Sequence, residues 1–319
     1  MKMAKRKPYR ILSLAGGGYL GYYTACVLAE LEARAGKPLG RCFDLIAGTS
    51  VGGILALGLA YEVPVAQMRR LFAERGVDIF SARPLASGAV GNLLDLTRSV
   101  WGPKYNGQTL RKALAEKLGE RTLREALHPV VIPAVNVSKS MTKVFKTPHA
   151  ERSTGDERIL AVDAAMATCA APAYFPAVRV GEDLFADGGM FAVAPDLVAL
   201  HEAEQFVGVD AADISMLSIG TGTLRYAPAH GVGEDDGAVG WLAEGRLVLT
   251  LISVQQQHVQ AMMLDRLRDR YMHLDALWPP RAGLGIDVAT PSAAKTLAGL
   301  ARETLRETDL DDLARRFFC

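Results

Sequence analysis

The sequence has few cysteines, no excess of charge of either sign and no long hydrophobic run. Its four cysteines, Cys26, Cys42, Cys169 and Cys319, lack the paired spacing of a zinc site or a disulfide framework. Lysine and arginine number 36 against 35 aspartates and glutamates, which leaves a net charge of +1. A protein that binds duplex nucleic acid normally carries a larger basic excess. We therefore expect no metal site and no duplex nucleic acid as a partner.

No stretch has the length of a transmembrane helix. The longest apolar stretches, residues 51–61 and 247–254, are well short of the roughly 18 residues that suggest a span. The first ten residues carry five basic side chains, but three glycines break the apolar run that follows, unlike a secretory signal. With 319 residues, 50% of them hydrophobic, the chain can bury a substantial core. These features predict a cytoplasmic protein.

The N-terminal part contains two strand–turn–helix units. An apolar strand at 10–15 leads through three glycines into a helix, and a second strand at 43–47 leads through residues 48–53 into another. Successive units of this kind favour a parallel sheet with helices on its faces. Further strands are expected at 130–137, 184–186 and 216–220, a helix at 255–275, and loops at 81–107 and 228–240.

The pentapeptide at 48–52 matches the G-x-S-x-G pattern of a nucleophile elbow and lies between a strand and a helix. Gly48 and Gly52 allow the tight turn that projects the Ser50 hydroxyl outward. The start of a helix also favours the negative charge that develops during acyl transfer. The pattern therefore predicts Ser50 as a nucleophile.

A serine nucleophile needs a base. None of the six histidines lies in a Gly-rich turn typical of a catalytic loop; they are His128, His149, His201, His230, His258 and His273. A histidine triad thus has no support, although the pattern does not exclude one. Asp187 precedes two glycines and follows an apolar pair, so it falls at a strand end, where open sheets form active sites. Asp187 is the candidate base, and the alternative is a turn that closes a hairpin.

Residues 16–21 satisfy the G-x-G-x-x-G pattern of a dinucleotide site. That function needs an acidic residue at the end of the second strand, whereas Asp44 lies at its start. The backbone amides of Gly16, Gly17 and Gly18 are better placed to form an oxyanion hole for the carbonyl that the serine attacks.

Together these elements resemble the patatin-like phospholipase family. The ordered family motifs are a Gly-rich turn, a serine elbow and an Asp-Gly-Gly segment, here at 16–21, 48–52 and 187–189. The sequences at 170–176 and 217–222 are similar to two further family landmarks, so that the resemblance runs from residue 10 to residue 225. One departure is Leu20, where the family usually has a basic residue.

The resemblance implies a single domain over residues 1–319 with a three-layer α/β/α fold and a mostly parallel central sheet. The motifs occupy a core at 10–225, and a helical extension follows at 241–319. By this resemblance Ser50 takes the acyl group of a glycerophospholipid, Asp187 is the general base, and water releases a fatty acid. The reaction requires no metal or other cofactor. Its substrate is a phospholipid membrane surface, so the active protein is expected to lie on the inner membrane face.

The compact core with a C-terminal extension also resembles the cyclic-nucleotide-activated phospholipases of bacterial antiphage signalling. That narrower resemblance implies a cyclic di- or trinucleotide activator and a role in antiviral defence. Two alternatives remain open. One is a constitutive lipid acyl hydrolase without nucleotide control, and the other is a non-catalytic protein of the same fold that binds lipid or nucleotide. The sequence is compatible with a homo-oligomer.

Overall fold

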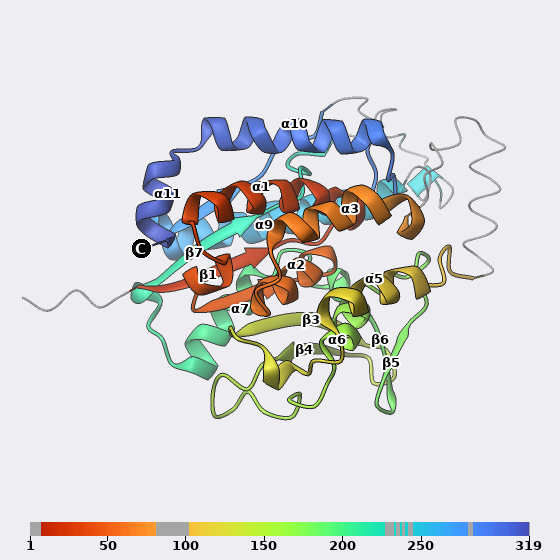
Figure 1. The fold of residues 1–319 in the computed structure, drawn as a ribbon, viewed down its shortest axis with the longest axis horizontal. Helices are drawn as coiled ribbons and strands as arrows, with labels where there is room; N and C mark the ends of the chain where they lie inside the picture. Colours follow the sequence, from red (N-terminus) through yellow and green to blue (C-terminus); the bar gives the residue numbers. More distant parts are fainter. Residues whose placement is uncertain are drawn as a thin grey trace, which may run out of the picture.

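A computed structural model (Figure 1) describes residues 8–80, 102–226, 233, 237, 240–241, 245–279 and 283–318. Most of the two segments expected as loops, 81–107 and 228–240, therefore lies outside the described residues. Within these described residues the sheet has eight strands: β1 (Tyr9–Leu14), β2 (Leu45–Gly48), β3 (Val130–Asn136), β4 (Met141–Lys146), β5 (Val178–Val180), β6 (Asp183–Asp187), β7 (Ile214–Ile219) and β8 (Tyr271–Leu274).

The strand order is β5-β6-β3-β2-β1-β7-β8, and β4 pairs with β3 off this path. Strands β3, β2, β1, β7 and β8 are parallel to their neighbours in that series, whereas β4 and β6 run antiparallel to β3. Strand β5 is antiparallel to β6. The expectation of a mostly parallel sheet is confirmed, and the antiparallel part is confined to one side.

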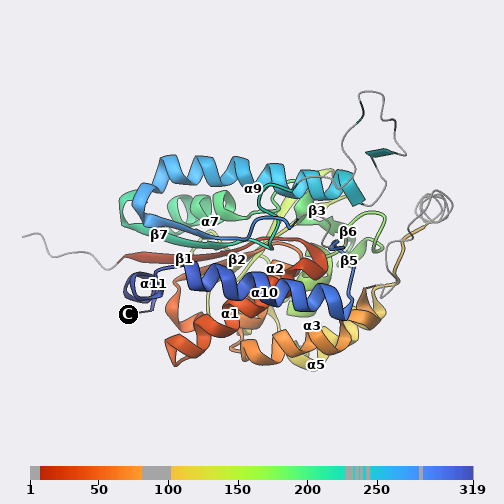
Figure 2. The same ribbon diagram turned by 90° about the horizontal axis from the view of Figure 1, so that it is seen from above.

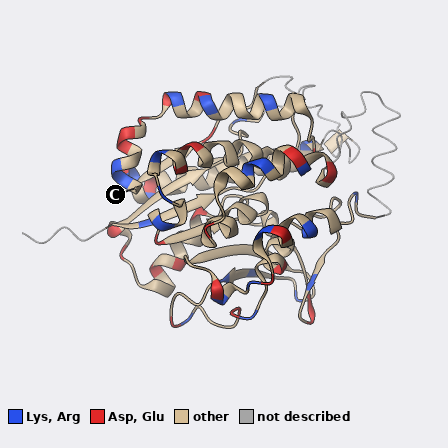
Figure 3. Ribbon diagram, in the orientation of Figure 1, with Lys and Arg blue, Asp and Glu red and all other residues tan. Residues whose placement is uncertain are grey.

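Helices cover both faces of the sheet. They are α1 (Gly21–Ala35), α2 (Val51–Ala60), α3 (Val65–Ile79), α5 (Gln108–Leu118), α6 (Ala161–Thr168), α7 (Asp196–Glu202), α9 (Arg246–Leu267), α10 (Pro291–Glu307) and α11 (Leu310–Phe317). Figure 2 shows α7 and α9 on one face, and α1, α3 and α10 on the other. This arrangement confirms the three layers that the sequence predicted. Figure 3 shows charged residues of both signs mixed over the outer helices and loops.

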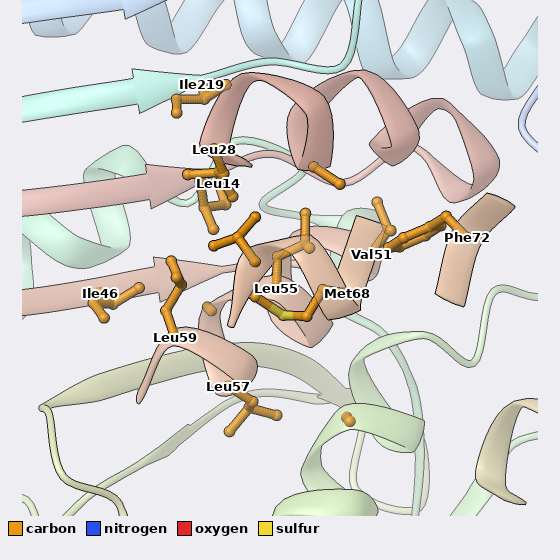
Figure 4. Close-up of a cluster of buried hydrophobic side chains, with 14 of the residues drawn as sticks. Leu14, Leu28, Ile46, Val51, Leu55, Leu57, Leu59, Met68, Phe72 and Ile219 are labelled. Atoms are coloured by element: carbon orange, nitrogen blue, oxygen red, sulfur yellow. The ribbon is translucent and has the colours of Figure 1, made fainter. Parts of the chain in front are cut away.

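The core lies on both sides of the central strands. Along β1, Ile11 packs towards α7 and α9, whereas Leu12 and Leu14 pack in the cluster formed with α1, α2 and α3. Figure 4 shows Leu14 in this cluster beside Leu28, Val51 and Leu55. Successive side chains of a strand point to opposite faces, so a strand covered on both faces is apolar throughout. Helix α2 is apolar on nearly all sides for the same reason, because it is surrounded by protein.

The C-terminal part differs from the sequence prediction. A helix was expected at 255–275, but α9 begins earlier, at Arg246, and ends at Leu267. After it, β8 pairs in parallel with β7, so the segment 241–319 is not wholly helical and completes the sheet. A segment of four residues is too short for its periodicity to separate a strand from a helix. The stripe that includes Met263 and Leu267 packs on the core, as expected.

Among the helices that the structure describes, none combines the length and the apolar character that crossing a bilayer requires.

Candidate active site

Ser50 lies on a strained turn between β2 and α2. Its φ of 54° and ψ of −125° are rare for a residue with a side chain. The Ser50 amide donates to Thr168 Oγ1 at 2.9 Å, and that hydroxyl donates to the Pro133 carbonyl at 2.6 Å. These bonds hold the turn to α6 and β3, and they fix the direction of the serine side chain.

The glycines of the elbow are required by close backbone contacts. A Cβ atom at Gly48 would lie 2.2 Å from the Gly52 carbonyl oxygen. A Cβ atom at Gly52 would lie 2.2 Å from the Leu14 carbonyl oxygen. Neither neighbour is a flexible side chain that could move away. Gly48 is therefore required by the tight turn into α2, and Gly52 by the packing of α2 against the end of β1.

Asp187 lies at the end of β6 and faces the serine. The Ser50 hydroxyl donates to Asp187 Oδ2 at 2.7 Å, and the Gly189 amide donates to Asp187 Oδ1 at 2.6 Å. Burial raises the pKa of Asp187 to about 6, although both hydrogen bonds favour the carboxylate. The Asp-Gly-Gly segment does not close a hairpin, because β5 and β6 are joined at residues 181–182.

The Gly-rich turn passes directly beside the serine. A Cβ atom at Gly16 would lie 3.2 Å from Ser50 Cβ. The Gly16 amide, however, donates to the Val193 carbonyl at 2.9 Å and is already used. Among the described residues, no acceptor contacts the amides of Gly17 and Gly18. Of the three glycines predicted for the oxyanion hole, Gly16 therefore shapes the turn, and the other two have amides available for a ligand.

A cavity of about 260 Å³ opens onto Ser50 and Asp187. Its wall is mainly apolar and includes Val51, Ile54, Leu71, Phe72, Phe80 and Phe175. Such a cavity suits an apolar chain attached to a reacting carbonyl. No histidine lines it within the described part of the chain. The group beside Ser50 that can act as its base is therefore the Asp187 carboxylate.

Two neighbouring positions could not be assigned from the sequence. Leu20, where the family usually has a basic residue, is fully buried in the core beside α1. Cys169 lines the cavity, and its thiol contacts the Ser50 hydroxyl. Burial raises the pKa of Cys169 well above its usual value, so the thiol stays protonated and is a poor nucleophile. Cys169 lies more than one hundred residues from Ser50 in the chain, so no sequence pattern indicated this contact.

A serine on a strand–turn–helix elbow whose hydroxyl donates a hydrogen bond to a buried carboxylate is typical of a serine hydrolase site. The chain belongs to the patatin-like phospholipase family, whose model matches residues 12–200. It is 39% identical over 302 residues to a cGAMP-activated phospholipase of Pseudomonas aeruginosa, covering 94% of this chain and 85% of the relative. It is 35% identical over 324 residues to a protein of the same name from Vibrio cholerae, covering 93% and 90%.

Among solved structures, VipD from Legionella pneumophila is a distant neighbour. The TM-score is 0.43 at 12% identity, over 93% of this chain and 67% of that one. The family resemblance found in the sequence is therefore confirmed by the family match and by the relatives in sequence.

Proposed function

We propose that this protein hydrolyses phospholipid esters with Ser50 as nucleophile and Asp187 as general base. The observation that carries this proposal is the 2.7 Å hydrogen bond from the Ser50 hydroxyl to the buried carboxylate. Ser50 Oγ bonds to the ester carbonyl carbon while its proton passes to Asp187. The amides of Gly17 and Gly18 hold the oxyanion that forms.

The second half of the reaction uses the same groups. When the tetrahedral intermediate collapses, the lysophospholipid oxygen leaves and takes the proton from Asp187. Water then attacks the acyl-Ser50 ester while Asp187 accepts its proton. As the Ser50 oxygen leaves, it takes that proton from Asp187, and the fatty acid is released. The pKa of about 6 keeps Asp187 ionised at neutral pH and makes it a stronger base than an exposed carboxylate.

We propose further that the mouth of the cavity lies against the membrane. Met190 and Leu251 line the cavity, yet they are 54% and 49% exposed. Phe191 follows Met190 in the chain, and Val254 lies one turn after Leu251 on α9 with 57% of its surface exposed. These four residues, the mouth patch, present apolar side chains where a lipid chain has to enter. Exposed apolar patches of this kind mark contact surfaces.

A charge placed in the mouth patch is expected to lower activity on membrane substrates and to leave activity on soluble substrates unchanged. Val254→Asp lowers fatty-acid release from phospholipid vesicles by about 10-fold, because the carboxylate must be desolvated at the lipid surface. Hydrolysis of a soluble short-chain ester stays at the wild-type rate, since Val254 does not line the cavity. Leu127→Asp is the control, because Leu127 is 63% exposed and precedes β3, at the opposite end of the sheet from Ser50. Equal vesicle activity in both variants would contradict the membrane orientation.

We also propose that a cyclic nucleotide activates the enzyme on the cytoplasmic membrane face. The relatives named cGAMP-activated phospholipase align with more than nine-tenths of this chain, including the part beyond residue 225. The test is fatty-acid release from phospholipid vesicles with and without cGAMP, other cyclic dinucleotides and cyclic trinucleotides. Activity that requires one nucleotide and is absent in Ser50→Ala supports the proposal. Equal activity without any nucleotide indicates a constitutive lipase. Light scattering of the same samples shows whether a homo-oligomer forms.

A further inference from the structure

Three consecutive glutamines on α9 have different surroundings. Gln255 is half-buried: its Oε1 accepts from the Val193 amide at 3.2 Å, and its Nε2 donates to the Gly189 carbonyl at 3.3 Å. Gln256 is buried and accepts from Thr223 Oγ1 at 3.1 Å. Gln257 is exposed and donates to Ser253 Oγ of its own helix at 2.8 Å. Of the three, Gln255 is the one that joins α9 to the segment after Asp187.

One partner of Gln255 contacts the base directly, and the other holds the turn that lies beside the serine. The Gly189 amide donates to Asp187 Oδ1 at 2.6 Å. The Val193 carbonyl accepts from the Gly16 amide at 2.9 Å, and Gly16 lies against Ser50. One amide side chain therefore holds Gly189 by its carbonyl, while the amide of the same residue orients the base. It also holds Val193 by its amide, while the carbonyl of the same residue anchors the Gly-rich turn. No contact places Gln255 in the wall of the cavity.

We infer that Gln255 is a positioning residue, which fixes the segment 187–193 so that the base and the oxyanion hole keep their geometry. The inference rests on the proposed roles of Ser50 and Asp187. It assigns to α9, which lies outside the family match at 12–200, a hold on the catalytic groups through Gly189 and Val193. Small displacements of catalytic groups lower kcat even when substrate binding is unchanged.

The electrostatics of Asp187 provide a specific readout. Burial raises the pKa of Asp187, and the hydrogen bonds from Gly189 and Ser50 oppose this rise. Among the described residues, the other titratable group beside it is the Cys169 thiol, which is protonated. When the Gly189 carbonyl is no longer held, the residue is free to turn, and the hydrogen bond from its amide to the carboxylate weakens. The pKa of Asp187 then rises further.

The experiment uses the full chain and a soluble short-chain ester, with the most effective nucleotide present if the wild type needs one. Gln255→Ala is expected to lower kcat by about 10-fold with little change in KM. The acidic limb of its pH profile moves up by about half a unit to one unit. Gln255→Glu keeps the acceptor for Val193 but loses the donor to Gly189, and its added charge moves the limb up as well. Gln257→Ala, the matched control, behaves as the wild type.

The outcomes are distinguishable. A folded Gln255→Ala with wild-type kcat and pH profile overturns the inference, and so does a loss of melting temperature without any shift of the acidic limb. If Gln255→Ala does not fold, Gln255→Met retains the packing of the side-chain stem and is judged by the same two measurements. Failure of the proposed function looks different, because Ser50→Ala then retains turnover whatever the Gln255 variants do.

Discussion

Ser50→Ala is expected to lower kcat for ester hydrolysis by at least about 10³-fold, since the covalent route through the serine is lost. The variant should melt within a few degrees of the wild type, because the missing hydroxyl contacts only the side chains of Asp187 and Cys169 among the described residues and fills no core space. Fatty-acid release measured against thermal unfolding of the same preparation tests both statements. Turnover near the wild-type rate in a folded Ser50→Ala protein would refute the assignment of the nucleophile.

Two control variants make that result specific. Ser292→Ala changes an exposed serine in the first turn of α10 and should keep full activity. His258→Ala should also remain active, because the described histidines do not line the cavity. A folded but inactive His258→Ala protein would favour a histidine base over Asp187.

Asp187→Asn is expected to remove activity and to stabilise the fold near neutral pH. The amide cannot accept the serine proton, so kcat falls by about 10²- to 10⁴-fold. In the wild type, activity should decline as pH falls through about 6, where Asp187 becomes protonated. A pH profile of kcat tests whether the wild type shows this decline below about pH 6. The residual activity of Asp187→Asn should not show it.

The stability effect follows from the direction of the same pKa shift. The folded-state pKa of Asp187 lies at about 6, above its ordinary value of 3.8. The raised value favours folding while the group is protonated, and that advantage is lost as pH rises from about 4 to about 6. Two pKa units correspond to about 3 kcal/mol, an upper bound on what asparagine regains above pH 6.

Urea unfolding at about pH 7.5 and about pH 4.5 measures this difference. The stability gain of Asp187→Asn should be larger at the higher pH and should narrow at the lower one. Asp183→Asn is the matched control on the same strand, because Lys139 and Asn136 lower the pKa of Asp183. The control should keep its activity and gain no stability near neutral pH. An Asp187→Asn protein that is less stable than the wild type at both pH values would contradict the burial argument.

Much of the fold could be predicted because its central strands are apolar segments, most of which end at or just before a glycine. The expected strands at 10–15, 43–47, 130–137, 184–186 and 216–220 correspond to β1, β2, β3, β6 and β7, with ends shifted by one or two residues. The sequence did not reveal β4, β5 and β8. Strand β4 is partly exposed, and β5 has three residues. Strand β8 follows a long helix closely, so its four residues fall within the helix expected at 255–275.

The sequence by itself determined the residues that depend on local backbone geometry. Ser50, Asp187 and the glycines beside them are short motifs at strand ends, and each motif sets its own turn. The tertiary structure decided how these motifs are completed. The Val193 carbonyl accepts the hydrogen bond of the Gly16 amide. The Gln255 side chain, on a helix more than sixty residues further along the chain, donates to the Gly189 carbonyl. Contacts between distant segments depend on how α9 packs across the sheet, and no local pattern encodes that packing.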